Sequence, residues 1–483
     1  MHLGVDIGTS GVKAVLVDAA DRVVAEAASA PLVVSRPQPL WSEQDPAAWW
    51  QAVIEALDTL ATQAPSGMAA VQGIGLSGQM LGVALLDRDD AVLRPALLWN
   101  DGRASVEGAE LHQRFPDFVE RVGCRAMPGF SAPKLLWLAR HEPAVLARTR
   151  RVLLPKDYVR LCLTGEAASD RADASATLLM DTARGDWAGD IVAACGLDLA
   201  WLPRLVESAE VAGTVRDVWA ARWGLPHGVP VVGGGGDNMC AAVGVGAVAA
   251  GDAYIGLGTS GVCFVANDVF LPAHGQGMHT HRHAVPGFFC QNAVVLSAAG
   301  ALAWVAEMIQ ARDIGKLVAE VEAAKLSPAD TPVFTPYLAG ERTPHDNPHL
   351  TASFSGLTHA TGPLHLVQAV MEGVALALGD AHRALRGTGA AIERLSLTGG
   401  GARSDLWVRL IATALGMPLT VASSTHAGPA LGAARLARAG TGGPLIAGDP
   451  ADGQLRRVTP DPALAVVLGD KRAAFDAHLR LVR

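Results

Sequence analysis

Hydrophobic residues gather in two short, similar stretches, one at the start of the chain and one near its middle. In both, an apolar run leads into a Gly-Thr-Ser-Gly turn and a second apolar run follows, over residues 4–18 and 254–265. Two β-rich segments joined by a short link of glycine, threonine and serine predict a β-hairpin. The near-repetition indicates two related halves that each open with such a hairpin, and we place them at residues 1–247 and 248–483.

Between and after the hairpins, periodic apolar positions predict alternating strands and helices. Apolar residues at helical spacing predict a helix over 42–64, with Asp45 as its N-cap and Pro46 in its first turn. The stretch 103–222 is expected to be mostly helical. Further predicted strands lie at 71–76, 83–86, 97–98, 229–232 and 395–398, and further predicted helices at 239–248, 298–311, 365–385, 404–415 and 429–439. This alternation predicts an α/β fold.

Composition and charge exclude several classes of function. Half of the residues are hydrophobic and 18% are charged, the balance of an ordinary soluble α/β protein. The net charge is −8 and no lysine- and arginine-rich run occurs, so we expect no nucleic-acid partner and no membrane partner. No run of 18 or more apolar residues occurs, and residues 1–3 lead straight into a strand without a signal-peptide pattern. The six cysteines lie far apart, which favours free thiols, a cytoplasmic location and no zinc site.

The glycine-rich turns carry the first candidate chemistry. Glycine lets other groups approach the backbone closely, and turn N–H groups with threonine and serine hydroxyls can converge on a phosphate. One such turn alone is more often a plain surface hairpin, but two copies in matched halves predict two phosphate-contacting hairpins that face each other across a cleft. A further glycine run, 399–401, stands between strand 395–398 and helix 404–415, where a nucleotide can lie against bare backbone at a helix N-terminus.

Asp237 is the most informative carboxylate. It follows four glycines after the predicted buried strand 229–232, where packing explains an acid poorly because an unpaired buried charge is costly. One interpretation is a cap for the helix that follows. The other is a general base that accepts a proton from a substrate hydroxyl, with the glycines leaving room for a polyhydroxylated substrate. Both uses can coexist. In the second interpretation, Asp6 acts at the end of the site where the metal and the nucleotide bind.

Patterns of other functional classes are absent or lack their structural context. Residues 256–261 match G-x-G-x-x-G, but a strand pattern follows instead of a helix, so a dinucleotide-binding fingerprint is not expected. No G-x-x-x-x-G-K-[ST] motif occurs, which excludes a P-loop as far as a motif can. The alternating His279, His281 and His283 have no carboxylate or cysteine close in sequence. We therefore expect a solvated strand or loop face there, and not a metal site.

Taken in order along the chain, these sequence motifs resemble those of the FGGY family of carbohydrate kinases. The resemblance covers nearly the whole chain and rests on residues 4–13, 39–46, 98–103, 132–137, 154–158, 233–238, 256–261, 340–345, 354–359 and 399–404. That many long matches in one order are specific, whereas the single motifs are not. The resemblance implies two actin-like ATPase lobes, each a ribonuclease-H-like sheet flanked by helices, around a central cleft. It also implies that the first lobe binds the sugar and the second lobe the nucleotide.

The resemblance further implies an activity and a set of site residues. The implied reaction is ATP-dependent phosphorylation of the terminal 5-hydroxyl of D-xylulose, with Mg²⁺; a homodimer is the hypothesis for the assembly. By position, Asp237 matches the catalytic base, and Asp6 matches an acid near the metal that acts through water. The implied sugar contacts are Gln79, Met80, Leu81, Trp99, Asp101 and Asn238. The implied ATP contacts are Thr9, Ser10, Lys13, Gly258, Thr259, Ser260, Gly400, Gly401 and Asp405.

One departure from the resemblance concerns the sugar. Where the pattern Gly-Gln-Met-His-Gly is expected, this chain has Leu81 in place of the histidine. A histidine can hydrogen-bond a sugar hydroxyl and a leucine cannot, so we expect weaker discrimination or a preference for a different or absent hydroxyl. The alternatives are another ketose, a deoxyketose or a polyol. A further alternative from a different class is an actin-like nucleotide-gated binding protein without sugar kinase activity. The glycine-rich segment that leads to Asp237 and the polar segment 99–103 argue against it.

Overall fold

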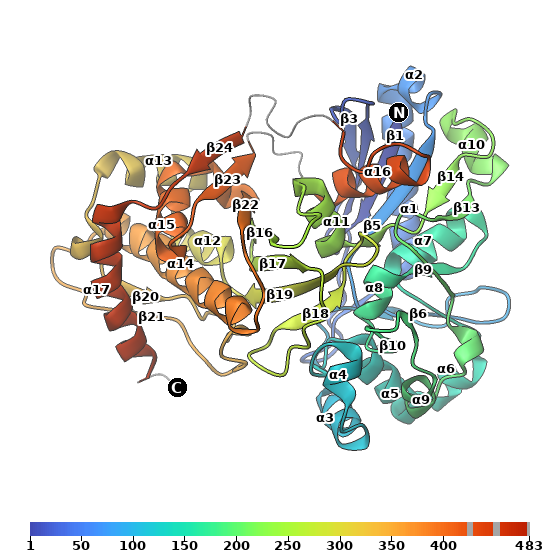
Figure 1. The fold of residues 1–483 in the computed structure, drawn as a ribbon, viewed down its shortest axis with the longest axis horizontal. Coiled ribbons are helices and arrows are strands. Elements are labelled where there is room, and N and C mark those ends of the chain that lie inside the picture. Colours follow the sequence, from blue (N-terminus) through green and yellow to red (C-terminus); the bar gives the residue numbers. More distant parts are fainter. Residues whose placement is uncertain (423–427, 448–454, 481–483) are drawn as a thin grey trace.

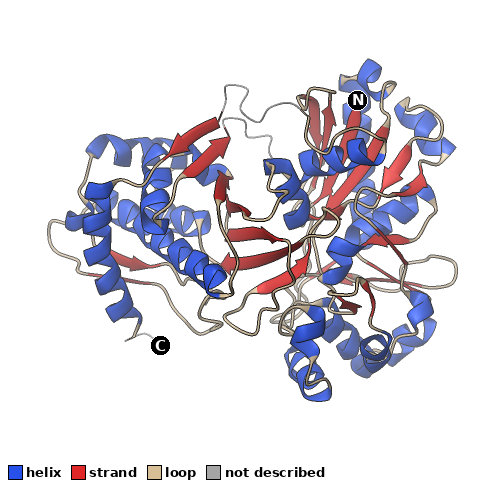
Figure 2. Cartoon of the chain, in the orientation of Figure 1, coloured by secondary structure: helices blue, strands red, loops and turns tan. Residues whose placement is uncertain are grey.

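The structure is a computed structural model, and it describes residues 1–422, 428–447 and 455–480. Its helices and strands form two lobes, and each lobe is built on a seven-stranded mixed sheet in the described part of the chain (Figures 1 and 2). Helices flank both sheets, as Figure 2 shows. The arrangement confirms the predicted α/β class with two lobes.

The first sheet contains the first predicted hairpin. β1 and β2 pair antiparallel through the turn after Ile7, and Asp6 lies opposite Lys13 across this pair. β1 also pairs parallel with β5, which brings Ser77 beside Asp6. The strand order is β13-β14-β5-β1-β2-β3, with β15 beside β5. The bounds are β1 (His2–Ile7), β2 (Val12–Val17), β3 (Val23–Ala28), β5 (Gly73–Gly78), β13 (Val211–Thr214), β14 (Pro230–Val232) and β15 (Gly235–Gly236).

The second sheet repeats this plan. β16 and β17 form the second predicted hairpin, and β16 pairs parallel with β22 as β1 does with β5. Both halves of the chain therefore place an antiparallel hairpin next to a parallel strand, as two related halves should. The order is β18-β19-β17-β16-β22-β23-β24. The bounds are β16 (Asp252–Leu257), β17 (Gly261–Asn267), β18 (His279–Arg282), β19 (Phe289–Val295), β22 (Arg394–Thr398), β23 (Leu419–Ala422) and β24 (Leu455–Val458).

The individually predicted helices are present, with ends shifted by a few residues, whereas the stretch 103–222, expected to be mostly helical, also contains short strands between its helices. Asp45 caps α1 and Pro46 begins it, as predicted, while α11 begins at Asp237 instead of residue 239. The helices are α1 (Pro46–Gln63), α2 (Pro65–Met68), α3 (Ser105–Arg114), α4 (Phe118–Val122), α5 (Ser131–His141), α6 (Pro143–Arg148), α7 (Pro155–Thr164), α8 (Arg171–Ser175), α9 (Gly189–Ala194), α10 (Asp217–Trp223), α11 (Asp237–Val245), α12 (Ala299–Met308), α13 (Ile314–Ala324), α14 (Pro363–Gly387), α15 (Asp405–Leu415), α16 (Pro429–Gly440) and α17 (Pro462–Leu479).

Short strand pairs join the segments outside the two main sheets. The strands predicted at 83–86 and 97–98 both form, but they pair with other partners and only a single bridge joins Val83 to Leu97. The pairs in the described residues are β4 (Glu43–Gln44) with β7 (Ala96–Leu97), β6 (Ala84–Leu86) with β8 (Arg151–Leu153), β9 (Ala168–Asp170) with β12 (Arg204–Val206), β10 (Met180–Asp181) with β11 (Asp186–Trp187) and β20 (Val333–Thr335) with β21 (Ser353–Ser355).

Helix α16 packs on the first sheet although it lies late in the chain (Figure 1). A Cβ atom at Gly4 would lie 1.9 Å from the carbonyl oxygen of Ala430, and one at Gly75 would lie 1.9 Å from that of Ala433. Glycine at these two strand positions therefore lets the helix backbone touch the sheet directly. The C-terminal half thus supplies a helix to the first lobe, and the division at residues 247 and 248 stays a prediction.

We expect Gly75→Ala to lower the free energy of unfolding by about 1–3 kcal/mol, the usual cost of overpacking. The added methyl group would meet backbone atoms of α16, which cannot rotate away as a side chain can. Urea unfolding followed by circular dichroism measures the effect. The control is Gly469→Ala in α17, where no atom lies within 4 Å of the new methyl group and alanine favours the helix. Equal midpoints for wild type and Gly75→Ala would contradict the close packing of α16.

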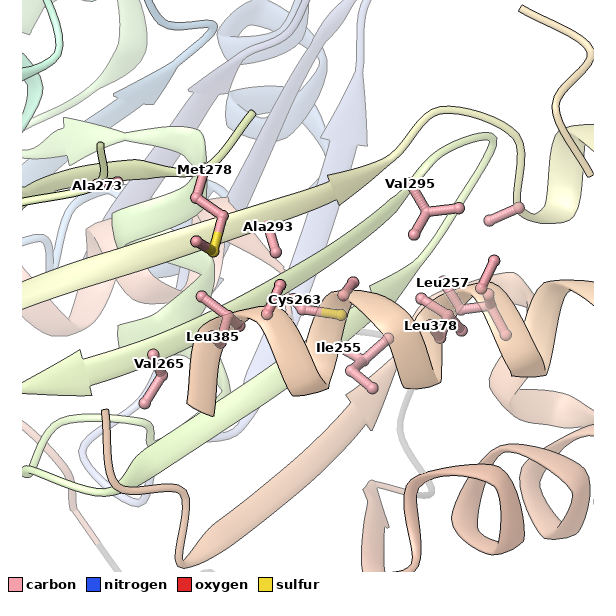
Figure 3. Packing of buried hydrophobic residues seen from close by; sticks show 14 of the residues in the cluster. Ile255, Leu257, Cys263, Val265, Ala273, Met278, Ala293, Val295, Leu378 and Leu385 are labelled. Carbon is pink, nitrogen blue, oxygen red and sulfur yellow. The ribbon is translucent and has the colours of Figure 1, made fainter. Parts of the chain in front are cut away.

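The core of the second lobe lies between its sheet and α14. In Figure 3, Ile255, Leu257 and Cys263 of the hairpin lie against Leu378 and Leu385 of α14. Among the described residues, α14 is also the one helix that is long and apolar enough to cross a membrane, but 83% of that stretch is buried inside the protein. Its apolar character is therefore explained by its place in the core.

Candidate active site

A cavity of about 180 Å³ lies between the two lobes, and we name it the Asp237 cavity. Residues of both lobes line it, so both lobes can contact whatever it binds. The first lobe contributes Met80, Leu81, Trp99, Phe130, Asp237 and Asn238, and the second lobe contributes Ser260, Val262, His279, His281, Asn292, Val294 and Arg342. Four predicted sugar contacts, the predicted base and one predicted ATP contact thus come together here. A second cavity of about 330 Å³ shares Leu81, Trp99, Phe130 and Arg342 with it.

Asp237 stands at the start of α11 with its carboxylate largely unused by the protein. The N-cap of the helix is Gly236, which makes no side-chain capping bond. Among the described residues, the Asp237 carboxylate accepts one hydrogen bond, from the backbone N–H of Asn238 at 2.7 Å. Burial and, to a smaller extent, the charge of Asp6 raise the pKa of Asp237 to about 7. The position suits a general base that works near neutral pH.

Asp6 lies on β1 close enough for its charge to act on Asp237. Its Oδ1 accepts a hydrogen bond from the Ser77 hydroxyl at 2.8 Å. Burial raises the pKa of Asp6 to about 6, although the Ser77 hydrogen bond and the Lys13 charge oppose the rise. The charge of Asp6 raises the pKa of Asp237, so a cation near the two carboxyl groups would favour their ionised forms. In the described part of the chain no cluster of three or more histidine, cysteine or acidic residues could hold a metal ion.

Thr9 connects the first glycine turn to two of the predicted sugar contacts, Gln79 and Trp99. Its hydroxyl donates to Gln79 Oε1 at 2.9 Å and accepts from the indole N–H of Trp99 at 3.0 Å. The Gln79 amide in turn donates to Gln44 at 3.1 Å, and Gln44 donates to the Thr9 carbonyl at 2.7 Å. Trp99 stays 41% exposed and lines both cavities. Gln79 lines neither, so its side chain positions Thr9 and Trp99.

Asp101 is buried in the wall of the second cavity and holds a loop in place. Its Oδ2 accepts the backbone N–H of Ser42 at 2.7 Å, and both of its oxygens accept from Arg103. The guanidinium of Arg103 lies 3.5 Å over the ring of Trp41. These hydrogen bonds give Asp101 a structural role. Direct contact of Asp101 with a sugar stays a prediction.

The other predicted ATP contacts lie outside the two cavities. Lys13 pairs with Glu26 at 3.0 Å, and Ser10 is exposed at the first turn. Gly400 and Gly401 lie in a short 3₁₀ turn after β22, and a Cβ atom at Gly400 would meet no atom within 4 Å. Asp405 begins α15, is exposed and pairs with Arg456. Gly258 and Thr259 stand in the second turn, whose carbonyl groups accept N–H bonds from residues 298–300.

The expectation of a solvated histidine face is wrong. His279, His281 and His283 are 7%, 2% and 4% exposed. The first two lie on β18, an edge strand of the second sheet that first-lobe residues such as Phe130 cover, and His283 follows this strand. Arg282 donates from its backbone N–H to Ser175 at 2.9 Å and from its side chain to the first-lobe segment 182–183. Contacts between lobes leave no local sequence signal, so sequence reasoning missed that His279 and His281 line the Asp237 cavity.

Comparison with known protein families assigns both halves of the chain. Residues 1–244 match the N-terminal domain of the FGGY family of carbohydrate kinases, and residues 253–440 match its C-terminal domain. The chain belongs to the FGGY family. As a carbohydrate kinase, it is a phosphotransferase that acts on a sugar and ATP.

Individual members of the family are similar over nearly the whole of this kinase. It is 45% identical to the xylulose kinase of Escherichia coli, over 91% of this chain and 90% of that relative. Its fold is similar to the crystal structure of a xyloylose kinase from Brucella ovis, with 44% identity and a TM-score of 0.92 over 99% of this chain and 98% of the other. The xylulose kinase of Rhodospirillum rubrum gives 32% identity and a TM-score of 0.89 over the same shares. The expected fold of two actin-like lobes is confirmed.

Proposed function

We propose that this carbohydrate kinase transfers the γ-phosphoryl group of ATP to the 5-hydroxyl of D-xylulose, which gives D-xylulose 5-phosphate and ADP. The observation that carries the proposal is Asp237, a carboxylate with a pKa raised to about 7 on the wall of a cavity between the lobes. The choice of sugar rests on a relative, 45% identical, that is a xylulose kinase. Because Leu81 stands where the family resemblance leads us to expect a histidine, the alternative substrates are another ketose, a deoxyketose or a polyol.

In this mechanism Asp237 orients the acceptor hydroxyl and takes its proton as the oxygen attacks the γ-phosphorus. The two glycine turns, with Thr9, Ser10 and residues 258–260, present N–H groups and hydroxyls to the phosphates. Mg²⁺ bound with ATP would neutralise phosphate charge, with Asp6 holding it through water. Closure of the lobes excludes water, which would otherwise hydrolyse ATP. Phosphoryl transfer needs mainly such positioning and charge neutralisation.

The test is the initial rate of ADP formation from Mg-ATP with and without D-xylulose, beside a panel of ketoses, deoxyketoses and polyols. Strong stimulation by D-xylulose at sub-millimolar concentration is expected. Stimulation by a different sugar alone would keep the kinase and make Leu81 the residue that sets specificity. Binding of ATP without any response to a sugar would contradict the proposal and favour a nucleotide-gated binding protein.

We expect kcat/KM for the sugar to rise with pH up to a plateau, with an apparent pKa near 7. Asp237 accepts a proton only as the carboxylate, and because its pKa is raised to about 7, the carboxylate fraction falls as the pH drops below that value. Each further pH unit on the acid side then costs roughly tenfold in rate. Since Asp6 interacts with Asp237, the measured value belongs to the pair. Initial rates at saturating Mg-ATP from acidic to alkaline pH measure it, and a flat acid side would remove Asp237 from the role.

The location and assembly of the enzyme are also part of the proposal. Five of the six cysteines are buried free thiols and the sixth is half-buried, which suits a reducing compartment such as the cytoplasm. A homodimer stays the prediction for the assembly. Light scattering tests it, because a dimer has twice the chain mass of 49.9 kDa.

A further inference from the structure

One wall of the Asp237 cavity carries a row of polar side chains from the second lobe. His279 and His281 alternate along β18, and Asn292 on β19 lies directly opposite His279. Alternate residues of a strand, and residues directly opposite on its partner, share one face of the sheet. The two imidazole rings are 5.8 Å apart, and the His279 ring meets the Phe130 ring edge-on at 5.1 Å. Two strands of the second lobe thus aim three polar groups at a site whose predicted base belongs to the first lobe.

Each of these three side chains has a buried polar atom that lacks a partner. His279 Nε2, His281 Nδ1 and Asn292 Oδ1 make no hydrogen bond among the described residues, and the three residues are 7%, 2% and 2% exposed. Buried polar groups without partners are uncommon and cost free energy. Three of them on one cavity wall indicate a polar ligand that completes their bonds.

His283 provides a contrast on the same run of histidines. Its Nε2 donates to the carbonyl of Ala247 at 3.0 Å, and its Nδ1 accepts the N–H of Val285 at 2.9 Å. Both ring nitrogens are therefore used to hold the backbone, and His283 does not line the cavity. The unpaired atoms of His279 and His281 are thus a property of the cavity wall and not of the histidine run as a whole.

The charge state of the two rings indicates which ligand they suit. Burial lowers the pKa of His279 well below its usual range, helped by the Arg342 charge, and burial lowers the pKa of His281 to about 3. Both rings are neutral at pH 7, so each offers one donor and one acceptor, while Asn292 Oδ1 accepts. Hydroxyl groups can both donate and accept, and a neutral polyhydroxylated molecule matches such a wall without needing a charge.

We propose that His279, His281 and Asn292 form the second-lobe half of the sugar site and hydrogen-bond sugar hydroxyls other than the one that Asp237 deprotonates. The proposal rests on the proposed function, because it needs the sugar to lie in the Asp237 cavity. Leu81 on the first-lobe wall offers no polar group, and the histidines offer one from the opposite lobe. A sugar bound in this way touches both lobes, so its binding favours their closure over ATP.

The test compares His279→Phe, His281→Phe and the double variant with wild type. Phenylalanine keeps the ring and removes the nitrogens. Each single change is expected to raise the KM for D-xylulose roughly five- to tenfold, the worth of one hydrogen bond, and to leave the KM for ATP within about twofold. The deciding measurement uses analogues of D-xylulose that each lack or invert one hydroxyl. For the analogue that lacks the contacted hydroxyl, the variant and the wild type should have equal KM values.

A structural role would give a different result, which His283→Phe illustrates. This control is expected to lower the melting temperature and to leave the ranking of the analogues unchanged. If a phenylalanine variant does not fold, His281→Gln takes its place, and a changed ranking of the analogues supports the proposal while an unchanged ranking overturns it. Wild type that ignores D-xylulose would refute the proposed function. Wild type that responds to D-xylulose, beside variants with unaltered sugar KM values, would refute this inference alone.

Discussion

Replacement of Asp237 by alanine is expected to lower kcat for sugar-dependent ADP formation by roughly two to four orders of magnitude, the usual size of a general-base effect. Among the described residues, Asp237 is the one acidic side chain that lines the Asp237 cavity. Alanine removes the predicted base, while the turns around Thr9 and Ser260, which are predicted to bind phosphate, stay in place. The loss should therefore appear in kcat, and the KM for ATP should change little.

The measurement is a single-turnover experiment, which separates the chemical step from product release. Asp217→Ala is the matched control, because Asp217 is also the first residue of a helix, α10, but lies exposed beside His227. That control should turn over at the wild-type rate. A single-turnover rate of Asp237→Ala within tenfold of wild type would show that another group takes the proton.

The parts of the fold that could be predicted from the sequence have a local cause. The two hairpins follow from apolar runs around a glycine turn, and both formed where expected. The start of α1 follows from Asp45 and Pro46, whose effects act within one helical turn. The functional importance of Asp237 could be predicted because four glycines and a buried strand directly precede it in the chain. All of these signals lie within about ten residues of the feature that they predict.

The parts that escaped prediction depend on contacts between distant segments. The pattern around residues 279–283 has the same form whether solvent or another lobe covers the strand, so the burial of His279 and His281 was not visible. The residues around Gly75 in the sequence give no sign that the backbone of α16 packs on it. A cluster of buried charges next to the glycine run before Asp237 was likewise not predicted, because its residues come from three separate elements, α7, β9 and α8. That cluster is the basis of the second large effect that we expect.

Lys156→Met is expected to lower the free energy of unfolding by about 3–5 kcal/mol, the cost of breaking a buried ion pair by removing one partner. Lys156 Nζ lies 2.7 Å from carboxylate oxygens of Asp157 and Asp170 and 3.1 Å from one of Asp173, and all four side chains are fully buried. Arg160 pairs with Asp157 as well. Three carboxyl groups thus face two cations, and loss of one cation leaves buried negative charge on Asp157 and Asp170 without full compensation.

The position of the cluster couples this loss of stability to the active site. Arg160 also donates to the carbonyl of Gly233, in the glycine run that leads to Asp237, and a Cβ atom at Gly236 would lie 3.1 Å from Asp173 Oδ1. Weakening of the cluster should therefore loosen the loop that positions the predicted base. We expect the folded fraction of Lys156→Met to have a lower kcat than wild type, and kcat normalised to the folded fraction measures this.

The control for Lys156→Met is Asp173→Asn, which changes the same cluster without stranding a charge. Burial, strengthened by the charge of Asp170 and opposed by Lys156, raises the pKa of Asp173 to about 8, so the folded protein holds this group protonated at neutral pH and an amide can replace it. The unfolded chain ionises the group near 3.8. Stability from it is therefore present in acid and is lost as the pH rises from about 4 to about 8. Asp173→Asn should remove that slope: it should cost below about 1 kcal/mol in acid, where both side chains are neutral, and should be at least as stable as wild type at neutral pH, where only the aspartate carries the protonation penalty. Urea unfolding at several pH values measures both variants. Equal losses from the two substitutions would mean that the cluster responds to shape alone, whereas a large loss confined to Lys156→Met identifies charge compensation as its task.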